Sequence, residues 1–267
     1  MSKVVLITGG SSGLGKSIGE FLNSKGYQII GTSRNPSKYA DTKFPLVTLD
    51  VTDTQSISAC VKEAKQQFGR IDILINNAGV GITGPMEEIP IEEVRANFET
   101  NYFGPIQMMN EVLPIMRNQN EGLIINITSI AAFMGLPFRG VYSSSKSALE
   151  IATEAYRLEL KDFNINVCNL APGDFATNIA AGRFHAPVVQ GSAYELKYGA
   201  TLKDIDDHVD EGNDPIKVAQ AVYSIINTKN PRIHYKVGAF MQKFSVILKN
   251  LLPDRVYERM LANHYKL

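Results

Sequence analysis

The chain has no excess of charge of either sign. Among its 267 residues, 27 lysines and arginines balance 27 aspartates and glutamates. A chain without net charge provides no basic field that would attract nucleic acid or an anionic lipid surface. We therefore expect no nucleic-acid partner.

Cysteine and histidine are also scarce. The two cysteines, Cys60 and Cys168, lie in apolar stretches, and the four histidines are scattered along the chain. Neither cysteine has a second cysteine or a histidine at the spacing of a metal site. We expect two buried thiols, a reducing and hence cytoplasmic location, and no metal.

Long apolar runs are missing as well. The first run, residues 4–8, ends at glycines and is too short for a signal peptide or a membrane span. It predicts a buried strand instead. Because no internal repeat, low-complexity tract or flexible linker appears, we expect residues 1–267 to form a single domain.

Apolar runs of strand length alternate with segments of helical periodicity. The predicted strands cover residues 4–8, 28–32, 46–49, 71–75, 123–128, 165–170 and 233–237. The predicted helices cover residues 14–25, 54–68, 91–116, 143–162 and 215–227. This alternation predicts an α/β fold: a Rossmann-type, doubly wound parallel sheet of about seven strands with helices on both faces. Such sheets bind ligands at the carboxyl ends of their strands.

The first strand runs into a glycine-rich turn, TGGSSGLGKS, at residues 8–17. Glycines let the backbone approach a phosphate group, and the N-terminus of the following helix attracts its charge. The pattern G-x-x-x-x-G-K-S, from Gly10 to Ser17, matches the P-loop of nucleoside triphosphatases. The pattern T-G-x-x-x-G-x-G, from Thr8 to Gly15, is that of a dinucleotide-binding turn. The turn alone leaves both hypotheses open.

Polar side chains follow two later strands. INNAG at residues 75–79 ends one strand, and its amides suggest side chains that hold neighbouring loops in place. NITS at residues 126–129 ends the next strand on Ser129. The loop after Ser129 returns the chain to the same edge of the sheet, so Ser129 can meet Tyr142 and Lys146.

Tyr142 and Lys146 are spaced i and i+4 in VYSSSKSALE, and so lie on one face of the predicted helix. An ammonium beside a phenol stabilises the phenolate, which allows the phenol to act as a general acid and base. The spacing alone is not specific, because Tyr39 and Lys43 repeat it. That second pair has no counterpart of Ser129 at a strand end and stands just before Pro45, so we predict a solvated loop.

These motifs together resemble the short-chain dehydrogenase/reductase family. The matching segments are TGGSSGLG at 8–15, LDV at 49–51, NNAG at 76–79, NYFG at 101–104, Ser129, YSSSK at 142–146 and PGDFAT at 172–177. GVGITGPMEEIP, together with NYFG, is similar to the hydroxysteroid and retinol dehydrogenase branch. The resemblance implies an oxidoreductase that transfers a hydride between a nicotinamide cofactor and a carbonyl compound or secondary alcohol. The alternatives are a P-loop phosphotransferase and a nucleotide-binding regulator without catalytic activity.

The resemblance also implies catalytic roles for four residues. Tyr142 would donate or accept the proton, and Lys146 would support its phenolate and bind the nicotinamide ribose. Ser129 would hold the substrate oxygen. Asn101, within the predicted helix 91–116, would hold a water that relays protons to Lys146.

Further residues are implied as cofactor contacts, and two of them indicate which cofactor is used. The implied contacts are Gly9, Ser11, Ser12, Gly13, Leu14, Gly15, Ser33, Arg34, Asp50, Val51, Asn77, Ala78, Gly79, Tyr142, Lys146, Pro172, Gly173 and Thr177. Ser33 stands where NAD sites have an acidic residue, and the guanidinium of Arg34 could bind a 2′-phosphate. We therefore expect NADP(H) to be preferred over NAD(H).

Two later segments are expected to surround the substrate. Residues 174–213 should form a variable lid, whose aromatic residues favour an apolar carbonyl compound. Residues 239–267 should form a helical extension, in which one stripe consists of Phe240, Phe244, Ile247, Leu248 and Leu251. We expect this stripe to be buried over the pocket or between subunits of a homodimer or homotetramer, rather than against a membrane surface.

Overall fold

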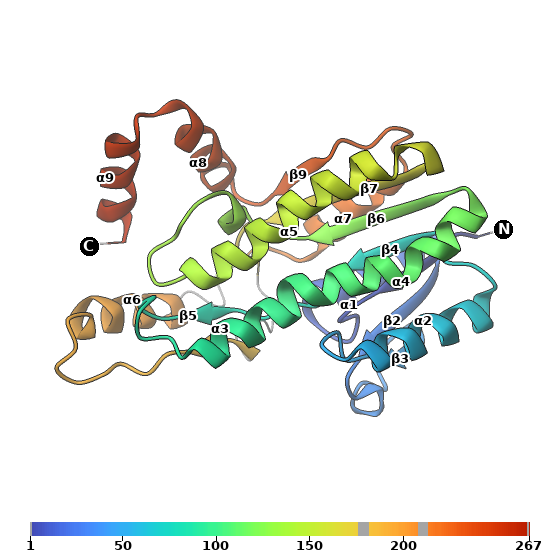
Figure 1. Ribbon diagram of the computed structural model, residues 1–267, viewed down its shortest axis with the longest axis horizontal. Coiled ribbons are helices and arrows are strands. Elements are labelled where there is room, and N and C mark those ends of the chain that lie inside the picture. The colour runs from blue at the N-terminus through green and yellow to red at the C-terminus, as the bar shows by residue number, and fades with distance from the viewer. Residues whose placement is uncertain (1, 176–181, 208–212, 266) are drawn as a thin grey trace.

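A parallel sheet of seven strands organises the molecule. The structure is a computed structural model and describes residues 2–175, 182–207, 213–265 and 267. The strands lie in the order β3-β2-β1-β4-β6-β7-β9 (Figure 1). They are β1 (Val4–Ile7), β2 (Gln28–Ser33), β3 (Leu46–Thr48), β4 (Ile73–Asn76), β6 (Gly122–Ile127), β7 (Ile165–Pro172) and β9 (His234–Val237). The order changes direction beside β1, so the switch point that binds ligands in such sheets lies between β1 and β4.

Helices cover both faces of the sheet. They are α1 (Gly13–Ser24), α2 (Thr54–Phe68), α3 (Ile91–Phe98), α4 (Gly104–Gln119), α5 (Gly140–Glu159) and α7 (Ile216–Ile226). Because successive strand residues point to opposite faces, Val4 and Leu6 pack under α2, α4 and α5, whereas Val5 and Ile7 pack under α1 and α7. These two apolar layers confirm the predicted doubly wound architecture.

Both cysteines lie inside these layers as free thiols, as predicted. Burial raises the pKa of Cys60 and that of Cys168 to about 12.

Short 3-10 helices occur at Pro36–Lys38, Ile130–Phe133 and Lys161–Phe163. Among the described residues, every helix is too short or too polar to cross a membrane.

The predicted helix over residues 91–116 differs from the observed structure at its centre. A π-helical turn, Glu99–Phe103, separates α3 from α4, although the chain continues in one direction through all three segments. Single π turns inside α-helices occur frequently at functional sites. This π turn contains Asn101, whose side chain is completely buried.

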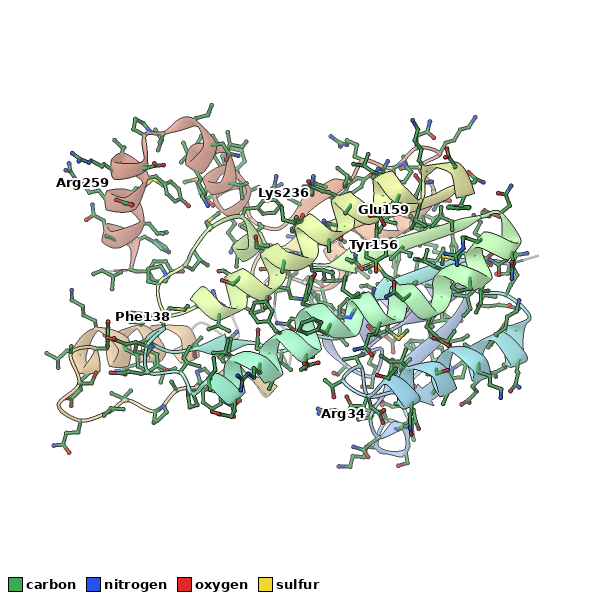
Figure 2. All side chains as sticks on the ribbon, in the orientation of Figure 1. Arg34, Phe138, Tyr156, Glu159, Lys236 and Arg259 are labelled. Carbon is green, nitrogen blue, oxygen red and sulfur yellow. The ribbon has the colours of Figure 1, made fainter. Side chains whose placement is uncertain are left out.

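The described part of the predicted lid has a small core of its own. Strands β5 (Ile82–Thr83) and β8 (Phe184–His185) pair in a second, two-stranded sheet, and α6 (Glu195–Asp207) follows. The rings of Phe138 and Tyr198 pack together with centroids 5.4 Å apart, and Phe138 can be seen beside this part of the molecule in Figure 2. The lid is therefore fixed to the loop before α5.

Two helices, α8 (Phe240–Leu251) and α9 (Asp254–His264), form one corner of the molecule beyond the sheet (Figure 1). Val246 of α8 and Tyr257 of α9 are buried against Ile130 and Met134. This contact turns the predicted apolar stripe outward: Phe240 is 72% exposed and Leu251 is 74% exposed. The expectation that the stripe is buried over the pocket is therefore wrong for Phe240, Ile247 and Leu251, although Leu248 does line the cleft, and burial between subunits remains a prediction.

Candidate active site

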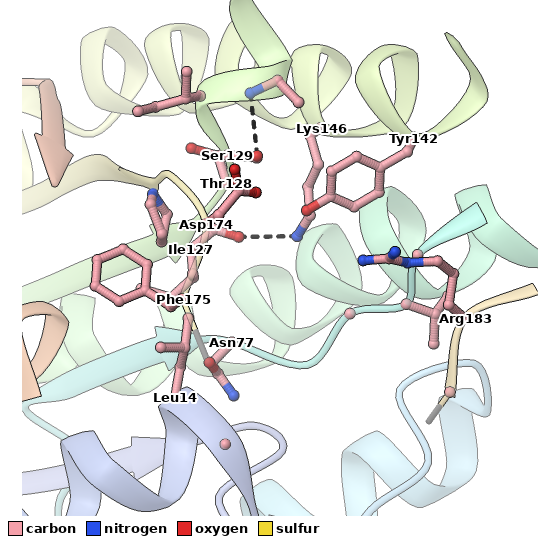
Figure 3. A pocket seen from close by; sticks show the side chains of 18 of the residues that line it. Leu14, Asn77, Ile127, Thr128, Ser129, Tyr142, Lys146, Asp174, Phe175 and Arg183 are labelled. Carbon is pink, nitrogen blue, oxygen red and sulfur yellow. Dashed lines mark hydrogen bonds between the residues drawn. The ribbon is translucent and has the colours of Figure 1, made fainter. Parts of the chain in front are cut away.

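A cleft of about 1450 Å³ runs along the carboxyl ends of the strands (Figure 3). One end is formed by the glycine-rich turn and the end of β2. The middle contains Ser129, Tyr142 and Lys146, and the other end lies against α8 and α9. The residues that the sequence predicted from separate strand ends are thus brought to one continuous surface.

The glycine-rich turn has the backbone of a phosphate cradle. Gly9 and Gly13 have positive φ angles of 64° and 52°, a region that favours glycine. A Cβ on Gly15 would lie 2.2 Å from the carbonyl oxygen of Gly9, so only glycine fits there. Ser12 is the residue before α1, whose free N–H groups face the cleft end and suit an anionic phosphate. The turn therefore fits a dinucleotide pyrophosphate.

Lys16 does not point into this cradle. Its ammonium forms an ion pair with Asp41, and this interaction raises the pKa of Lys16. The residue lies outside the cleft lining. A P-loop lysine must reach the β- and γ-phosphates, so this arrangement does not fit triphosphate chemistry.

Asn77 fixes the first loop to the end of β4. Its Nδ2 donates hydrogen bonds to the carbonyl oxygens of Thr8 (2.9 Å) and Gly9 (3.1 Å). In return, Thr8 Oγ1 accepts hydrogen bonds from the backbone N–H groups of Asn77 and Ala78. The sequence expectation that these amides hold neighbouring loops agrees with these contacts.

Ser129, Tyr142 and Lys146 converge in the middle of the cleft. Figure 3 shows the hydroxyl of Tyr142 and the ammonium of Lys146 pointing toward one another from neighbouring turns of α5, with Ser129 beside them. Ser129 Oγ accepts a hydrogen bond of 3.1 Å from the N–H of Ala131. That bond leaves the serine hydroxyl proton for donation to another oxygen.

Lys146 is almost fully buried, with 5% of its surface exposed. Its Nζ donates a hydrogen bond of 2.9 Å to the carbonyl oxygen of Ile127. Burial lowers the pKa of Lys146 to about 8, and the nearby charge of Glu150 opposes that effect. The ammonium is therefore mostly charged at neutral pH and loses its proton under mildly alkaline conditions.

Asn101 ties the π turn to α5. Its Oδ1 accepts a hydrogen bond from the N–H of Val80, and its Nδ2 donates to the carbonyl oxygen of Val80, both at 2.9 Å. Nδ2 also lies 3.1 Å from Ser145 Oγ on α5. A Cβ placed on Gly79 would lie 3.1 Å from Asn101 Oδ1 and 3.2 Å from Lys146 Nζ. Asn101 and Lys146 thus flank the same point of the β4–β5 loop, although Asn101 itself does not line the cleft.

A buried acid stands one turn beyond Lys146, and sequence reasoning missed it. Glu150 Oε2 accepts from Asn169 Nδ2 at 2.8 Å and lies 2.8 Å from Nδ1 of His234 on β9. Burial raises the pKa of Glu150, although hydrogen bonds from Thr128 and contacts with His234 partly oppose it. The i, i+4 spacing from Lys146 to Glu150 was a possible sequence signal for this pair.

The end of β2 forms the other extremity of the cleft. Ser33 is buried, whereas Arg34 is exposed and points away from the sheet in Figure 2. Burial would raise the pKa of Asp50, but hydrogen bonds from Thr52 and the charge of Arg34 outweigh it and lower the pKa.

Lys38, which sequence reasoning did not select, lines the cleft beside Arg34 and adds a second cation. Tyr39 lines it too, although the sequence placed that residue in a solvated loop.

The half of the cleft next to α8 and α9 has an apolar wall among polar side chains. The apolar side chains come from the loop after β6 and from both C-terminal helices: Met134, Leu136, Met241, Leu248, Met260 and Leu261. Gln242, Ser245, Tyr257 and His264 line the same half. Polar groups at its edge include Arg139, Asp174 and Tyr265. Burial raises the pKa of Tyr265, and the charge of Asp174 adds to that effect while Arg139 opposes it. The sequence placed Met134 and Leu136 as apolar surface near Ser129 and Leu248 in the stripe expected over the pocket, whereas it did not select Met241, Met260, Leu261, Arg139 or Tyr265.

All predicted cofactor contacts within the described residues line this cleft, with the exception of Gly15, which supports the turn from behind. Pro172 and Gly173 line it at the end of β7. Thr177 lies outside the described residues. In the part of the chain that the structure describes, no three His, Cys, Asp or Glu side chains are grouped to hold a metal ion.

Comparison with known proteins identifies the family. Residues 3–187 match the family model of the short chain dehydrogenases, so the chain belongs to the short-chain dehydrogenase/reductase family, as its motifs predicted. The 3-ketodihydrosphingosine reductase of Bacteroides thetaiotaomicron is 39% identical over 264 residues, which cover 98% of each chain. The NADPH-dependent 3-dehydrocapnine reductase of Ornithobacterium rhinotracheale is 31% identical over 281 residues, covering 99% of this chain and 98% of the relative.

Solved structures show the same relationship. A short-chain dehydrogenase from Streptomyces avermitilis superposes with a TM-score of 0.82 at 30% identity, covering 99% of this chain and 97% of that one. A Burkholderia phymatum member in complex with NAD has a TM-score of 0.80 at 25% identity, with coverages of 94% and 93%. A Burkholderia cenocepacia member in complex with NADP has a TM-score of 0.75 at 26% identity, with coverages of 99% and 97%. The family is one of oxidoreductases that bind NAD or NADP, and this membership replaces the phosphotransferase hypothesis.

Proposed function

We propose that the protein uses NADPH to reduce the 3-keto group of a long-chain amino lipid. The observation that carries this proposal is the composition of the cleft. A phosphate-binding turn lies at one end, a serine, a tyrosine and a lysine lie in the middle, and a half with an apolar wall lies against α8 and α9.

The proposed reaction assigns one step to each residue in the middle of the cleft. Bound NADPH supplies a hydride to the carbonyl carbon of the substrate. Tyr142 donates its hydroxyl proton to the carbonyl oxygen, and Ser129 donates a hydrogen bond to the same oxygen as it gains negative charge. The ammonium of Lys146 stabilises the phenolate that remains. We further propose that Asn101 supports a water that relays protons to Lys146.

The preference for NADPH rests on the end of β2. Ser33 stands in place of an acidic residue that would repel a 2′-phosphate, and Arg34 and Lys38 line the cleft beside it. A guanidinium binds phosphate through two parallel hydrogen bonds, and a lysine adds a point charge. One relative, the 3-dehydrocapnine reductase, is NADPH-dependent by name, which supports the same choice.

The substrate class is supported by both named relatives. Their names denote long-chain amino compounds that carry a keto group at carbon 3. The half of the cleft next to α8 and α9 would accommodate the alkyl chain along its apolar wall, which includes Leu136, Met241 and Leu248. The carboxylate of Asp174, at the edge of that half, would bind the ammonium group of such a substrate. We also expect the protein to work as a homodimer or homotetramer in the cytoplasm, as the sequence suggested.

The test begins with cofactor binding and continues with turnover. Fluorescence titration with NADPH, NADH and ATP should show the tightest binding for NADPH. NADPH oxidation should then be measured with 3-ketodihydrosphingosine, with a ketone of equal chain length that lacks the amino group, and with a short amino ketone. We expect kcat/KM to be at least about tenfold higher for the long-chain amino ketone than for either control.

An Asp174→Asn variant separates recognition of the amine from the chemistry. Its KM for the amino ketone should rise, while its turnover of the ketone without an amino group should not change. NADPH binding without turnover of any ketone would instead favour a catalytically silent regulator. Equal turnover of all three ketones would contradict the proposed substrate class.

A further inference from the structure

The outer face of α8 is apolar and exposed. Phe240, Phe244, Ile247 and Leu251 follow one another at i, i+4, i+7 and i+11, and therefore form one stripe along the helix. Phe240 is 72% exposed, Ile247 is 50% exposed and Leu251 is 74% exposed. The rings of Phe240 and Phe244 stack with centroids 5.7 Å apart. An apolar surface of this kind is typical of an interaction site.

α9 also has exposed apolar residues, and basic residues stand next to them in its sequence. Val256 is 51% exposed and Met260 is 37% exposed. Arg255 and Arg259 each precede one of these apolar residues and are spaced i and i+4, so they lie together along one side of α9. Figure 2 shows Arg259 pointing away from the body of the molecule. The two acidic residues of α9 lie in a different row. Residues 239–267 contain five lysines or arginines against two acidic residues, in a chain without net charge.

This surface continues into the cleft. Met241 is 67% exposed and also lines the cleft, and Met260 does the same from α9. Leu248, on the edge of the stripe, lines the cleft as well. An alkyl chain that approached along the two helices would therefore meet apolar side chains from the outer face to the interior.

We propose that α8 and α9 dock on an anionic membrane surface, from which the lipid substrate enters the cleft past Met241 and Met260. The entry of substrate rests on the proposed function, whereas the docking does not. α8 has 12 residues and a length of about 18 Å, which is too short to cross a hydrocarbon core of about 30 Å. An amphipathic helix of this kind, with flanking basic residues, lies in the plane of the interface.

The charges favour a membrane over a second copy of the chain as the partner. A two-fold contact centred on this face would bring together two copies of one patch, and residues 239–267 carry five lysines or arginines against two acidic residues, so the facing surfaces would have the same net charge. Like charges placed opposite one another weaken such a contact. An anionic lipid surface, in contrast, attracts each exposed lysine or arginine.

The docking is tested with vesicles in the absence of substrate and cofactor. The full-length protein should cosediment with phosphatidylcholine vesicles that contain phosphatidylserine. The double variant Phe240→Ser, Leu251→Ser should bind at least about tenfold more weakly, because both side chains would insert into the interface. The variant Arg255→Gln, Arg259→Gln should lose most of its preference for phosphatidylserine over pure phosphatidylcholine. Leu196→Ser, which removes an 86% exposed leucine from α6, is the matched control and should bind like the wild type.

Activity and oligomeric state complete the test. The Phe240→Ser, Leu251→Ser variant should reduce a water-soluble ketone at the wild-type rate and lose turnover only with substrate presented in vesicles. Wild-type protein that stays in the supernatant would overturn the docking proposal. So would unchanged vesicle binding combined with dissociation of an oligomer in light scattering, which would assign the face to a subunit contact. An enzyme that binds vesicles but reduces no amino ketone would contradict only the proposed function.

Discussion

Glu150 and His234 lie 2.8 Å apart, from Oε2 to Nδ1, and join α5 to β9 one helical turn beyond Lys146. The pair places a buried carboxylate close enough to the ammonium for its charge to oppose the lowering of the Lys146 pKa by burial. On the other side of His234, Nε2 lies 3.1 Å from Glu154, which is half-exposed. Through Glu150 and His234, charged groups near the proposed catalytic lysine thus reach β9, the strand at the edge of the sheet.

Replacing Glu150 should move the alkaline limit of activity. Glu150→Gln removes the negative charge that supports the Lys146 ammonium, so the pKa of Lys146 should fall further. The rate of NADPH oxidation should then decline at a lower pH than in the wild type, which a pH–rate profile between about pH 6 and pH 10 would record. Glu154→Gln is the matched control on the same helix, and its profile should not move. An equal displacement in both variants would mean that Glu150 has no specific influence on the lysine.

Lys146 should make the free energy of unfolding depend on pH. Its pKa is about 8 in the folded protein and 10.5 in the unfolded chain, so the cost of burying the charge is fully present below pH 8. That cost is relieved as the pH rises from 8 toward 10.5, because the unfolded chain then binds more protons than the folded one. The free energy of unfolding should gain about 2 kcal/mol between roughly pH 7 and pH 9.5, relative to a Lys146→Met variant. Denaturant unfolding of both proteins at the two pH values measures this difference, and parallel behaviour would contradict it.

Tyr142→Phe should separate binding from chemistry. The variant loses the proposed proton donor but keeps the ring, so its dissociation constant for NADPH should stay near that of the wild type. Turnover should fall by at least about two orders of magnitude, the usual scale for the loss of a general acid. Tyr156→Phe serves as the control, because Tyr156 is on the same helix and its hydroxyl bonds to Asn110 outside the cleft. Near-normal turnover of Tyr142→Phe would exclude the proposed mechanism.

Cofactor choice should depend on the cations at the end of β2. Arg34→Ala should weaken NADPH binding by about tenfold to a hundredfold, the value of one hydrogen bond to a charged group, and leave NADH binding nearly unchanged. Lys38→Ala should have a smaller effect in the same direction, and both effects should shrink at high salt. Adding Ser33→Asp to Arg34→Ala should turn the preference toward NADH, because the new carboxylate repels the phosphate and accepts the ribose hydroxyls. A loss shared equally by both cofactors would show that Arg34 does not bind the 2′-phosphate.

The parts of the site that the sequence predicted are those set by local patterns. Apolar runs ending in polar residues located the strand ends, and parallel strands bring those ends to one edge, so Asn77, Ser129 and Tyr142 could be placed together. The helical i, i+4 spacing then put Lys146 beside Tyr142. Contacts between distant segments left no such pattern. His234 approaches Glu150 because of the way β9 packs, and Met241 lies in the cleft because of the way α8 packs. The periodicity of apolar residues along the sequence does not predict either kind of packing.

The stripe on α8 shows how periodicity can mislead. The spacing of Phe240, Ile247 and Leu251 correctly predicted a helix with one apolar face, but an apolar face was equated with a buried one. The other face of α8 is held by Val246 against Met134 and by a hydrogen bond from Lys249 to the carbonyl oxygen of Phe133. These two contacts decide which face of α8 points toward the protein. Each depends on a single residue of the helix, so it leaves no repeating pattern in the sequence.

The π turn at Glu99–Phe103 has a consequence for how insertions and deletions act on this protein. A π turn contains about one residue more than the α-helical turn it replaces. Deleting Thr100 would let the segment close into a regular α-helix, which would rotate α3 by about 100° against α4 and draw it in by about 1.5 Å. Asn97 would then leave Ser145 Oγ, from which its Oδ1 now lies 2.8 Å away, and the support of the β4–β5 loop would be lost. A single codon in a helix would thus change the support of the β4–β5 loop and remove one residue, Thr100, from the lining of the cleft.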